Sequence, residues 1–404
     1  MYKFTLTAAW LIKPIIISVH VSASSTRLVC YFNSLAENRE EDGKVTVFDI
    51  DPNICTHLIY AFADINDQNE LVPSSATDIQ RYQSFNGLKA KFRTMVSTLA
   101  NRTKFIQSAI TLMRGNGFDG INLDWRFPGG DGSQPEDKLR FTVLCEELKD
   151  AFEAEGQAMN RDRLIVTASV SAERDTIDAS YEISKIAMHL DFINVLTFDF
   201  HGPWESVTGH HSPLYRGAKD TGDNIYSNTD SAMMYWRDQG TPAQKLNLGL
   251  AAYGRAFTLS SASATGNVGT PASGPGEDGC YTGVEGFWAS YETCLYLEDV
   301  TIKMIPDQKV PYAVTEDQWV GFDNKDSLNA KVNYLIANNF GGAFVWSLDL
   351  DDFHGQFCKQ GNYSFLSHLH SLLAPGNQNA KTVYHVLSCS GFECAFDLLT
   401  SALN

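Results

Sequence analysis

The 404-residue chain is poor in positive charge, because 31 Lys and Arg stand against 48 Asp and Glu and give a formal net charge of −17. Nucleic acids and anionic membrane surfaces are bound by basic patches, so neither is expected as a partner. After its N-terminal segment the chain also lacks any run of roughly 18 apolar residues, the length that spans a membrane. Its composition, with 44% hydrophobic and 12% aromatic residues, instead predicts a large packed core rather than disorder.

Residues 1–23 predict a secretory signal peptide. Lys3 gives a positive start, residues 4–11 and 15–21 are apolar, and small residues at 21–23 suit cleavage. Lys13-Pro14 interrupts the apolar run, which also disfavours a membrane anchor. We therefore expect a secreted, extracellular protein. The alternative is an N-terminus that is retained and poorly processed.

The most informative stretch is residues 118–129, FDGINLDWRFPG. Apolar residues alternate here with Asn122, Asp124 and Arg126, which is the period of a strand with polar groups on one face. A helix with an apolar stripe is predicted to follow at residues 135–152. Such a polar row does not suit the core of a barrel unless it lines a site. The alternative is a buried ion pair between Asp124 and Arg126 that serves packing.

This stretch resembles the signature of glycoside hydrolase family 18, the chitinases, which reads Asp-Gly-x-Asp-x-Asp-x-Glu followed by Tyr-Pro-Gly. On that pattern Asn122 replaces the first alternating Asp, Asp124 keeps the second, and Arg126 replaces the Glu. The resemblance implies that the Glu donates the proton and that the substrate's own acetamido oxygen is the nucleophile. A guanidinium holds its protons beyond roughly pH 12, so Arg126 cannot act as this acid. We therefore expect that the protein is not an enzyme.

Other segments also resemble the family and predict an α/β fold, a (β/α)8 TIM barrel that occupies residues 24–373. Apolar strands of this barrel are predicted at residues 27–32, 56–63, 118–126, 164–170, 191–202, 246–257 and 341–349. Residues 256–325, approximately, resemble the small α+β insertion that forms one wall of the family's sugar cleft. A tail, residues 374–404, has no counterpart in the family's barrel. Its two cysteines are too few for the six-cysteine chitin-binding module of some chitinases.

The third barrel strand is missing from its expected place between residues 63 and 118. Residues 77–88 and 92–113 predict helices, and no apolar, β-branched run lies between them. The Gly-Gly-Trp segment that ends this strand in the family is absent, together with the Trp that forms the floor of the sugar cleft. A closed barrel cannot omit a strand without exposing unpaired backbone groups. Either the helical segment partly unwinds to fill the gap, or the chain is a splice variant or gene-model artefact that folds poorly.

The resemblance also implies which residues line the cleft. Phe198 replaces a Tyr that steadies the acetamido group in active members, which is a second departure from catalysis. The implied carbohydrate contacts are Tyr31, Asp124, Asp199, Trp204, Tyr253, Arg255, Glu292 and Trp346. Leu35 stands where related chitin binders have a Trp, so we expect weak affinity. The alternative role for Asp199 is to cap a loop, and the alternative for Trp204 and Trp346 is that they belong to the core.

Eight cysteines in a chain with a predicted signal peptide suggest disulfides. The pairs implied by the family are Cys30–Cys55 and Cys294–Cys358. Cys145 falls on the apolar stripe of a predicted helix, where we expect a buried free thiol. The pairing of three cysteines stays open, Cys280, Cys389 and Cys394. Two sequences predict N-glycosylation, at Asn101 and Asn362.

These observations favour a secreted, catalytically inactive chitinase-like lectin that binds chitooligosaccharides, similar to the vertebrate chitinase and chitinase-3-like group. No cofactor or metal ion is expected. One alternative is a protein-binding signalling factor without sugar binding, with cell-surface or matrix glycoproteins as partners. The others are a residually active chitinase that uses Asp124 as its acid, and a non-functional truncated isoform.

Overall fold

The computed structural model describes residues 26–73, 85–130, 133–261, 266–373 and 384–390. The predicted signal peptide and Cys394 lie outside the described residues.

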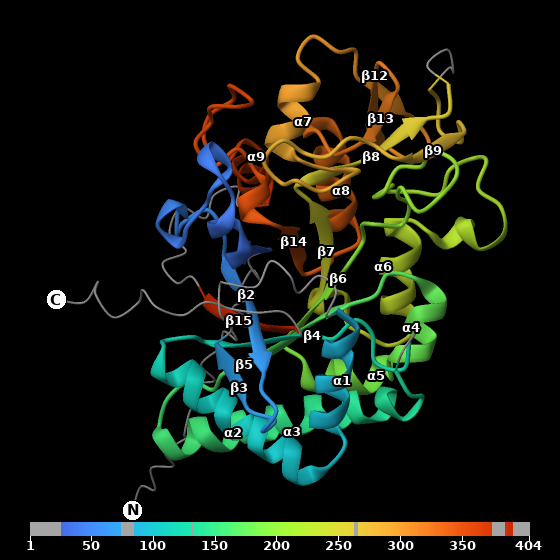
Figure 1. Ribbon diagram of the computed structural model, residues 1–404. Helices are drawn as coiled ribbons and strands as arrows, with labels where there is room; N and C mark the ends of the chain where they lie inside the picture. Colours follow the sequence, from blue (N-terminus) through green and yellow to red (C-terminus); the bar gives the residue numbers. More distant parts are fainter. Residues whose placement is uncertain (1–25, 74–84, 131–132, 262–265, 374–383, 391–404) are drawn as a thin grey trace, which may run out of the picture.

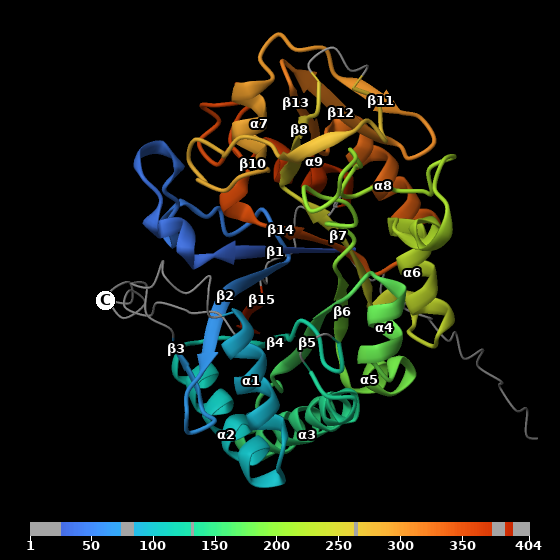
Figure 2. The same ribbon diagram turned by 45° about the vertical axis from the view of Figure 1, so that its right-hand side comes forward.

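Eight parallel strands form a closed barrel (Figures 1 and 2). In order around the barrel they are β1 (Arg27–Asn33), β2 (His57–Ile65), β15 (Tyr384–Ser390), β4 (Gly120–Asp124), β5 (Ile165–Val170), β6 (Phe192–Val195), β7 (Leu246–Ala251) and β14 (Gly342–Trp346). Because β1 pairs with both β14 and β2, the ring has no open edge. The predicted TIM barrel is confirmed.

Helices surround the barrel and fill most of the connections between its strands (Figure 2). They are α1 (Phe85–Val96), α2 (Leu99–Gly115), α3 (Glu136–Met159), α4 (Arg174–Ser180), α5 (Ile183–His189), α6 (Thr229–Asp238), α7 (Ser290–Tyr296), α8 (Lys325–Ala337) and α9 (Ser364–Leu373). Short 3-10 helices lie at Ser34–Asn38, Glu41–Gly43, Val47–Asp49, Gly222–Tyr226, Ala243–Lys245 and Leu348–Leu350. The predicted apolar stripe of α3 is buried at Phe141, Leu144, Leu148 and Phe152, at the spacing of one helix face. Among the described residues, no helix is both long and apolar enough to cross a membrane.

The place of the third strand, between β2 and β4, is filled by β15 from the end of the chain. Val386 lies opposite Ile59 of β2 on one side and Gly120 of β4 on the other, and both pairings are parallel. In both views β15, drawn in red, lies between β2 and β4 (Figures 1 and 2). The prediction that the tail has no counterpart in the barrel is therefore wrong for Tyr384–Ser390.

One expected outcome for the missing strand, the partial unwinding of the helical segment, does not occur; the other, a splice variant or gene-model artefact that folds poorly, stays an expectation. Phe85–Val96 and Leu99–Gly115 are helical and do not unwind into the gap, while residues 77–84 of the predicted helix lie outside the described residues. The tail segment fits the gap because its centre is apolar and is buried on both faces, as a strand of a parallel barrel is. The buried residues are Val386, Leu387, Ser388 and Cys389.

A second, antiparallel sheet stands beyond the carboxyl ends of the barrel strands (Figure 1). Its main path is β10 (Phe287–Ala289), β8 (Tyr253–Leu259), β13 (Gln318–Gly321), β12 (Val310–Thr315) and β11 (Lys303–Ile305), with β9 (Ala272–Pro275) beside β8. The predicted insertion is thus present, and it starts at Tyr253, immediately after β7. A short strand, β3 (Leu71–Pro73), pairs with the end of β2.

The two disulfides implied by the resemblance are present, Cys30–Cys55 and Cys294–Cys358. Cys145 is a buried free thiol, as predicted. Cys389 is also free and buried, and Cys280 is free and exposed. The three free thiols therefore lie in α3, in β15 and at the surface.

Candidate functional site

The site is built around β4, whose predicted alternation is confirmed. Trp125 points outward and stacks on Phe92 of α1 at 5.3 Å between ring centroids, while Asn122 and Asp124 are buried on the other face. Asn122 bonds inside the barrel to Ser169 of β5 at 3.0 Å and to Ser388 of β15 at 3.2 Å. The strand therefore delivers its polar row to the carboxyl end of the barrel, where sites of this fold lie.

Asp124 and Arg126 form a two-pronged ion pair. Arg126 Nε donates to Asp124 Oδ1 at 2.7 Å, and Arg126 Nη2 donates to Oδ2 at 3.1 Å. The Asp124 side chain is 2% exposed, whereas that of Arg126 is 35% exposed and faces the opening. Burial alone would lower the pKa of Arg126, but the Asp124 carboxylate outweighs it, and the pKa is raised above its ordinary value. Arg126 therefore keeps its protons near neutral pH and stays positively charged.

Trp346, at the end of β14, lies opposite this ion pair. The guanidinium of Arg126 is 6.0 Å from the centre of a Trp346 ring. Phe62 stacks on the indole at 5.7 Å and Tyr31 packs beside it at 5.3 Å. The indole is thus fixed by core aromatics and remains partly exposed, which suits an aromatic platform for the apolar face of a sugar.

Asp199, which follows β6, forms the second ion pair. Its backbone φ of 61° lies in the left-handed region that non-glycine residues rarely adopt. Arg255 of β8 donates to both Asp199 oxygens, at 2.8 and 2.9 Å. Burial would raise the pKa of Asp199, but the Arg255 guanidinium outweighs it and holds the pKa well below its usual range. Asp199 therefore anchors the insertion sheet to the barrel and stays ionised.

Three aromatic rings surround the guanidinium of Arg255. Phe287, Tyr253 and Trp204 lie 5.3, 5.4 and 5.6 Å from it, within the range of cation–π contacts. Trp204 is 61% exposed and offers a second open aromatic surface. Phe198, the residue in the place of the family's Tyr, is buried against Tyr253 and brings no hydroxyl group to the site.

Four of the predicted carbohydrate contacts are buried, namely Tyr31, Asp124, Tyr253 and Glu292. Tyr31 is 1% exposed and its hydroxyl bonds to Ser169 and Asn194, and Tyr253 is 3% exposed. Glu292 is fully buried, and its oxygens accept from the backbone N–H groups of Tyr281, Thr282 and Ala289 at 2.7 to 2.8 Å. Glu292 thus caps the start of α7 and fixes a loop. The open part of the site comprises Trp346, Arg126, Asp199, Arg255 and Trp204.

Sequence reasoning missed the contribution of β15. Ser388 accepts a hydrogen bond from Asn122, so the tail is part of the polar interior beneath the site. Tyr384–Ser390 contains no Trp, so the strand fills the third position without restoring the family's platform. Its apolar run of Val386 and Leu387 was the available signal, but nothing in that run indicates its partners.

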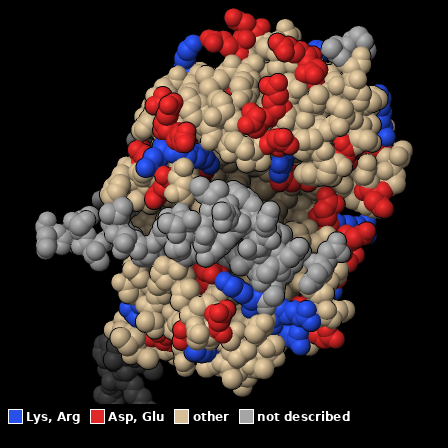
Figure 3. Space-filling view, viewed as in Figure 1, with Lys and Arg blue, Asp and Glu red and all other residues tan. Residues whose placement is uncertain are grey.

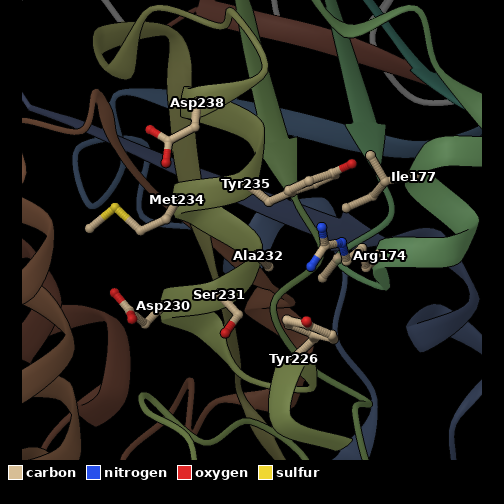
Figure 4. A pocket seen from close by; sticks show the side chains of 10 residues that line it. Arg174, Ile177, Tyr226, Asp230, Ser231, Ala232, Met234, Tyr235 and Asp238 are labelled. Carbon is tan, nitrogen blue, oxygen red and sulfur yellow. The ribbon is translucent and has the colours of Figure 1, made fainter. Parts of the chain in front are cut away.

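A separate pocket of about 310 Å³ lies between α4 and α6, outside the ring of strands. Figure 4 shows Arg174 held between the rings of Tyr226 and Tyr235, at 4.5 and 4.9 Å. Asp230 and Asp238 also line the pocket, and their charges oppose the binding of an anion to Arg174. The pocket shares no residue with the motif on β4, and we do not assign the sugar to it.

The described residues also bear on a metal site and on the two predicted glycosylation sites. Within the described ranges, no group of three or more His, Cys, Asp or Glu residues is arranged to hold a metal ion. Asn362 is exposed, while the amide of Asn101 donates to Thr94 O at 2.9 Å. Glycosylation of both remains a prediction.

Comparison with known proteins supports the resemblance seen in the sequence. Residues 27–351 match the model of the glycosyl hydrolases family 18. Chitotriosidase-1 of Mus musculus is 45% identical over 362 residues, which cover 85% of this chain and 77% of the mouse protein. Chitinase-3-like protein 2 of Homo sapiens is 42% identical over 361 residues, covering 84% and 90%. A solved structure of human YKL-39, described as a pseudo-chitinase with retained chitooligosaccharide binding properties, superposes with a TM-score of 0.79 at 41% identity, covering 86% of this chain and all of the other.

Proposed function

Since the chain belongs to the glycosyl hydrolases of family 18, we propose that it is a secreted chitinase-like lectin that binds chitooligosaccharides without cleaving them. The proposal is supported above all by Arg126, which the sequence resemblance aligns with the family's proton donor and which is paired with Asp124. The two disulfides and the predicted signal peptide support secretion.

The loss of hydrolysis follows from two independent groups. Cleavage of a glycosidic bond needs an acid that gives its proton to the leaving oxygen. Arg126 holds its protons, and Asp124 is committed as the acceptor of both prongs of the ion pair. At the second position, Phe198 brings no hydroxyl to steady the acetamido group. Restoring either position alone leaves the other defect in place.

The retention of binding is supported by groups that do no proton transfer. Trp346 and Trp204 present aromatic surfaces, on which the C–H face of a pyranose can stack. Asp199 and Arg255, which are paired with each other, offer polar groups beside Trp204. Human YKL-39 combines the same two properties, as a pseudo-chitinase with retained chitooligosaccharide binding. Affinity is weak in this proposal, because a platform worth on the order of 1 kcal/mol is absent from the third strand.

Isothermal titration with chitohexaose tests the proposal. We expect measurable heat from the wild-type chain and about a tenfold weaker Kd for Trp346→Ala, the loss expected for one stacking platform. Tyr226→Ala is the matched control, because it removes an exposed aromatic residue that packs on Arg174 outside the site; it should bind like the wild type. The absence of heat from the folded wild type would contradict sugar binding. The appearance of shorter oligomers by mass spectrometry would contradict inactivity.

A further inference from the structure

The strand β15 is attached to the barrel differently from the other seven strands. Each of those is followed along the chain by further described parts of the barrel, whereas β15 is the last of the described elements. Its sheet partners are β2 and β4. If β15 left, β2 would stay paired with β1, and β4 with β5. Its departure therefore breaks no hydrogen bond between other strands.

The facing edges of β2 and β4 form a groove that fits one parallel strand, here called the β2/β4 groove. At its entrance, His385 N donates to Asp119 Oδ2 at 2.8 Å and Tyr384 N donates to Thr56 O at 3.1 Å. The Tyr384 ring stacks on His57 at 5.0 Å with an interplanar angle of 19°. Further in, the strand is held by two backbone ladders, and register places Ser390 beside Asp124 at the far end. The groove thus runs from the amino end of the barrel to the floor of the site.

The forces that hold β15 are local and non-covalent. Among the described residues, no disulfide and no ion pair ties β15 to its neighbours, and Cys389 is a free thiol. By contrast, Cys30–Cys55 links β1 to the residues just before β2. A segment held only by its two backbone ladders and by the packing of Val386, Leu387 and Cys389 can open locally while the rest of the domain stays folded.

We propose that the β2/β4 groove is a strand-binding surface and that β15 occupies it as a detachable segment, which exchanges with the same segment supplied in trans. The occupant is the chain's own C-terminal strand. The proposal is independent of sugar binding, because none of its contacts involves the exposed residues of the site.

The three free thiols at different depths provide the first test. The full-length chain, with Cys394→Ser to remove the thiol that lies outside the described residues, is treated with an alkylating reagent under native conditions. Labelling is followed by peptide mass spectrometry. We expect Cys280 to react first, and Cys389 to react at least tenfold faster than Cys145, because Cys145 lies on the buried face of α3.

Two outcomes of this test would overturn the proposal. Equal rates for Cys389 and Cys145 would mean that β15 leaves only when the domain unfolds. Labelling of Cys389 as fast as the exposed Cys280 would mean that β15 does not occupy the groove.

Exchange in trans is the second test. A fluorescent peptide of residues 380–394, with its cysteines replaced by serine, is incubated with the full-length chain and separated by gel filtration. We expect saturable incorporation, and none for a Leu387→Pro peptide, since proline lacks the N–H that the ladder needs. Ala63→Cys places a thiol opposite Cys389, and the oxidised, cross-linked chain should reject the peptide. Incorporation of the proline peptide would overturn exchange, and so would incorporation of either peptide into the cross-linked chain. Exchange would also be overturned if Cys389 is labelled in the first test but the wild-type peptide is not incorporated.

Discussion

At the scale of single residues, Arg126 places a guanidinium at the end of β4 beside the carboxylate of Asp124. The strand keeps its alternation, and the guanidinium satisfies a carboxylate that is almost fully buried. The sequence allowed two interpretations of Asp124 and Arg126, a site and a structural ion pair. The structure shows the ion pair and places it at the carboxyl end of the barrel, so the two interpretations are compatible with each other.

Removal of one partner of this pair should destabilise the fold. We expect Arg126→Ala to lower the free energy of unfolding by about 2 to 3 kcal/mol, because it leaves Asp124 buried and unpaired. The value is below that for a fully buried pair because Arg126 is 35% exposed. Urea unfolding of both single variants and of Asp124→Ala/Arg126→Ala gives the coupling energy. Additive effects of the two changes would contradict a direct interaction.

Restoration of activity should require two changes together. In Arg126→Glu a carboxyl group stands beside Asp124, and the like charge raises one pKa of the pair, as an acid catalyst needs. Phe198→Tyr supplies the missing hydroxyl. We expect detectable turnover of a fluorogenic chitooligosaccharide for the double variant only. Equal turnover for Arg126→Glu alone would show that Phe198 is not a second defect.

At the scale of elements, the sequence predicted what is local. The strand around Asp124 and the helix stripe through Phe141 follow from periodicity, and the insertion and the disulfides follow from the family resemblance. The position of β15 could not be predicted in this way, because the sequence of a short apolar strand does not determine which strands it pairs with. Glu292 was misassigned for a related reason. A carboxylate that caps a loop and one that faces a cleft look alike until burial is known.

The burial of His57, which lies beneath Tyr384, should make stability depend on pH. Burial, and then the charge of Arg27, lower the pKa of His57 to about 4 from its ordinary 6.5. Between these values the unfolded chain binds more protons than the folded one. The contribution of His57 to the free energy of unfolding is therefore complete above pH 6.5, and it falls by roughly 2 to 3 kcal/mol as the pH drops to 4.

His57→Phe isolates this effect, because it keeps a ring under Tyr384 and removes the titration. Asp351 acts in the opposite direction over a similar range, since burial raises its pKa to about 6 and its contribution is lost as the pH rises. The informative quantity is therefore the difference between wild type and His57→Phe in urea unfolding, measured from pH 4 to 7. We expect the wild type to lose stability relative to the variant as the pH falls. A constant difference would contradict the assignment.

At the scale of the whole molecule, the charge distribution favours a neutral ligand. The net charge is −17, and Figure 3 shows acidic side chains over both the upper and the lower parts of one face. The two arginines of the site are each paired with an aspartate. Long-range attraction should therefore contribute little to the binding of an uncharged oligosaccharide.

Binding of chitohexaose should accordingly be insensitive to salt. We expect the Kd from isothermal titration to change less than twofold between 50 and 500 mM NaCl, because neither charge release nor screening enters. Heparin, a polyanion, is the control and should not bind at either concentration. A steep loss of affinity with salt would indicate an anionic ligand instead.

The circular order of strands has a consequence for biosynthesis. Ile59 and Val386 are neighbours across one backbone ladder although they lie far apart in the sequence, so Ile59 is synthesised long before Val386. Until Val386 and its strand are made, the facing edges of β2 and β4 lack this partner, and closure of the barrel depends on a contact between distant parts of the polymer. Strand edges exposed in this way promote aggregation, so folding of this barrel during synthesis should benefit from chaperones that cover them.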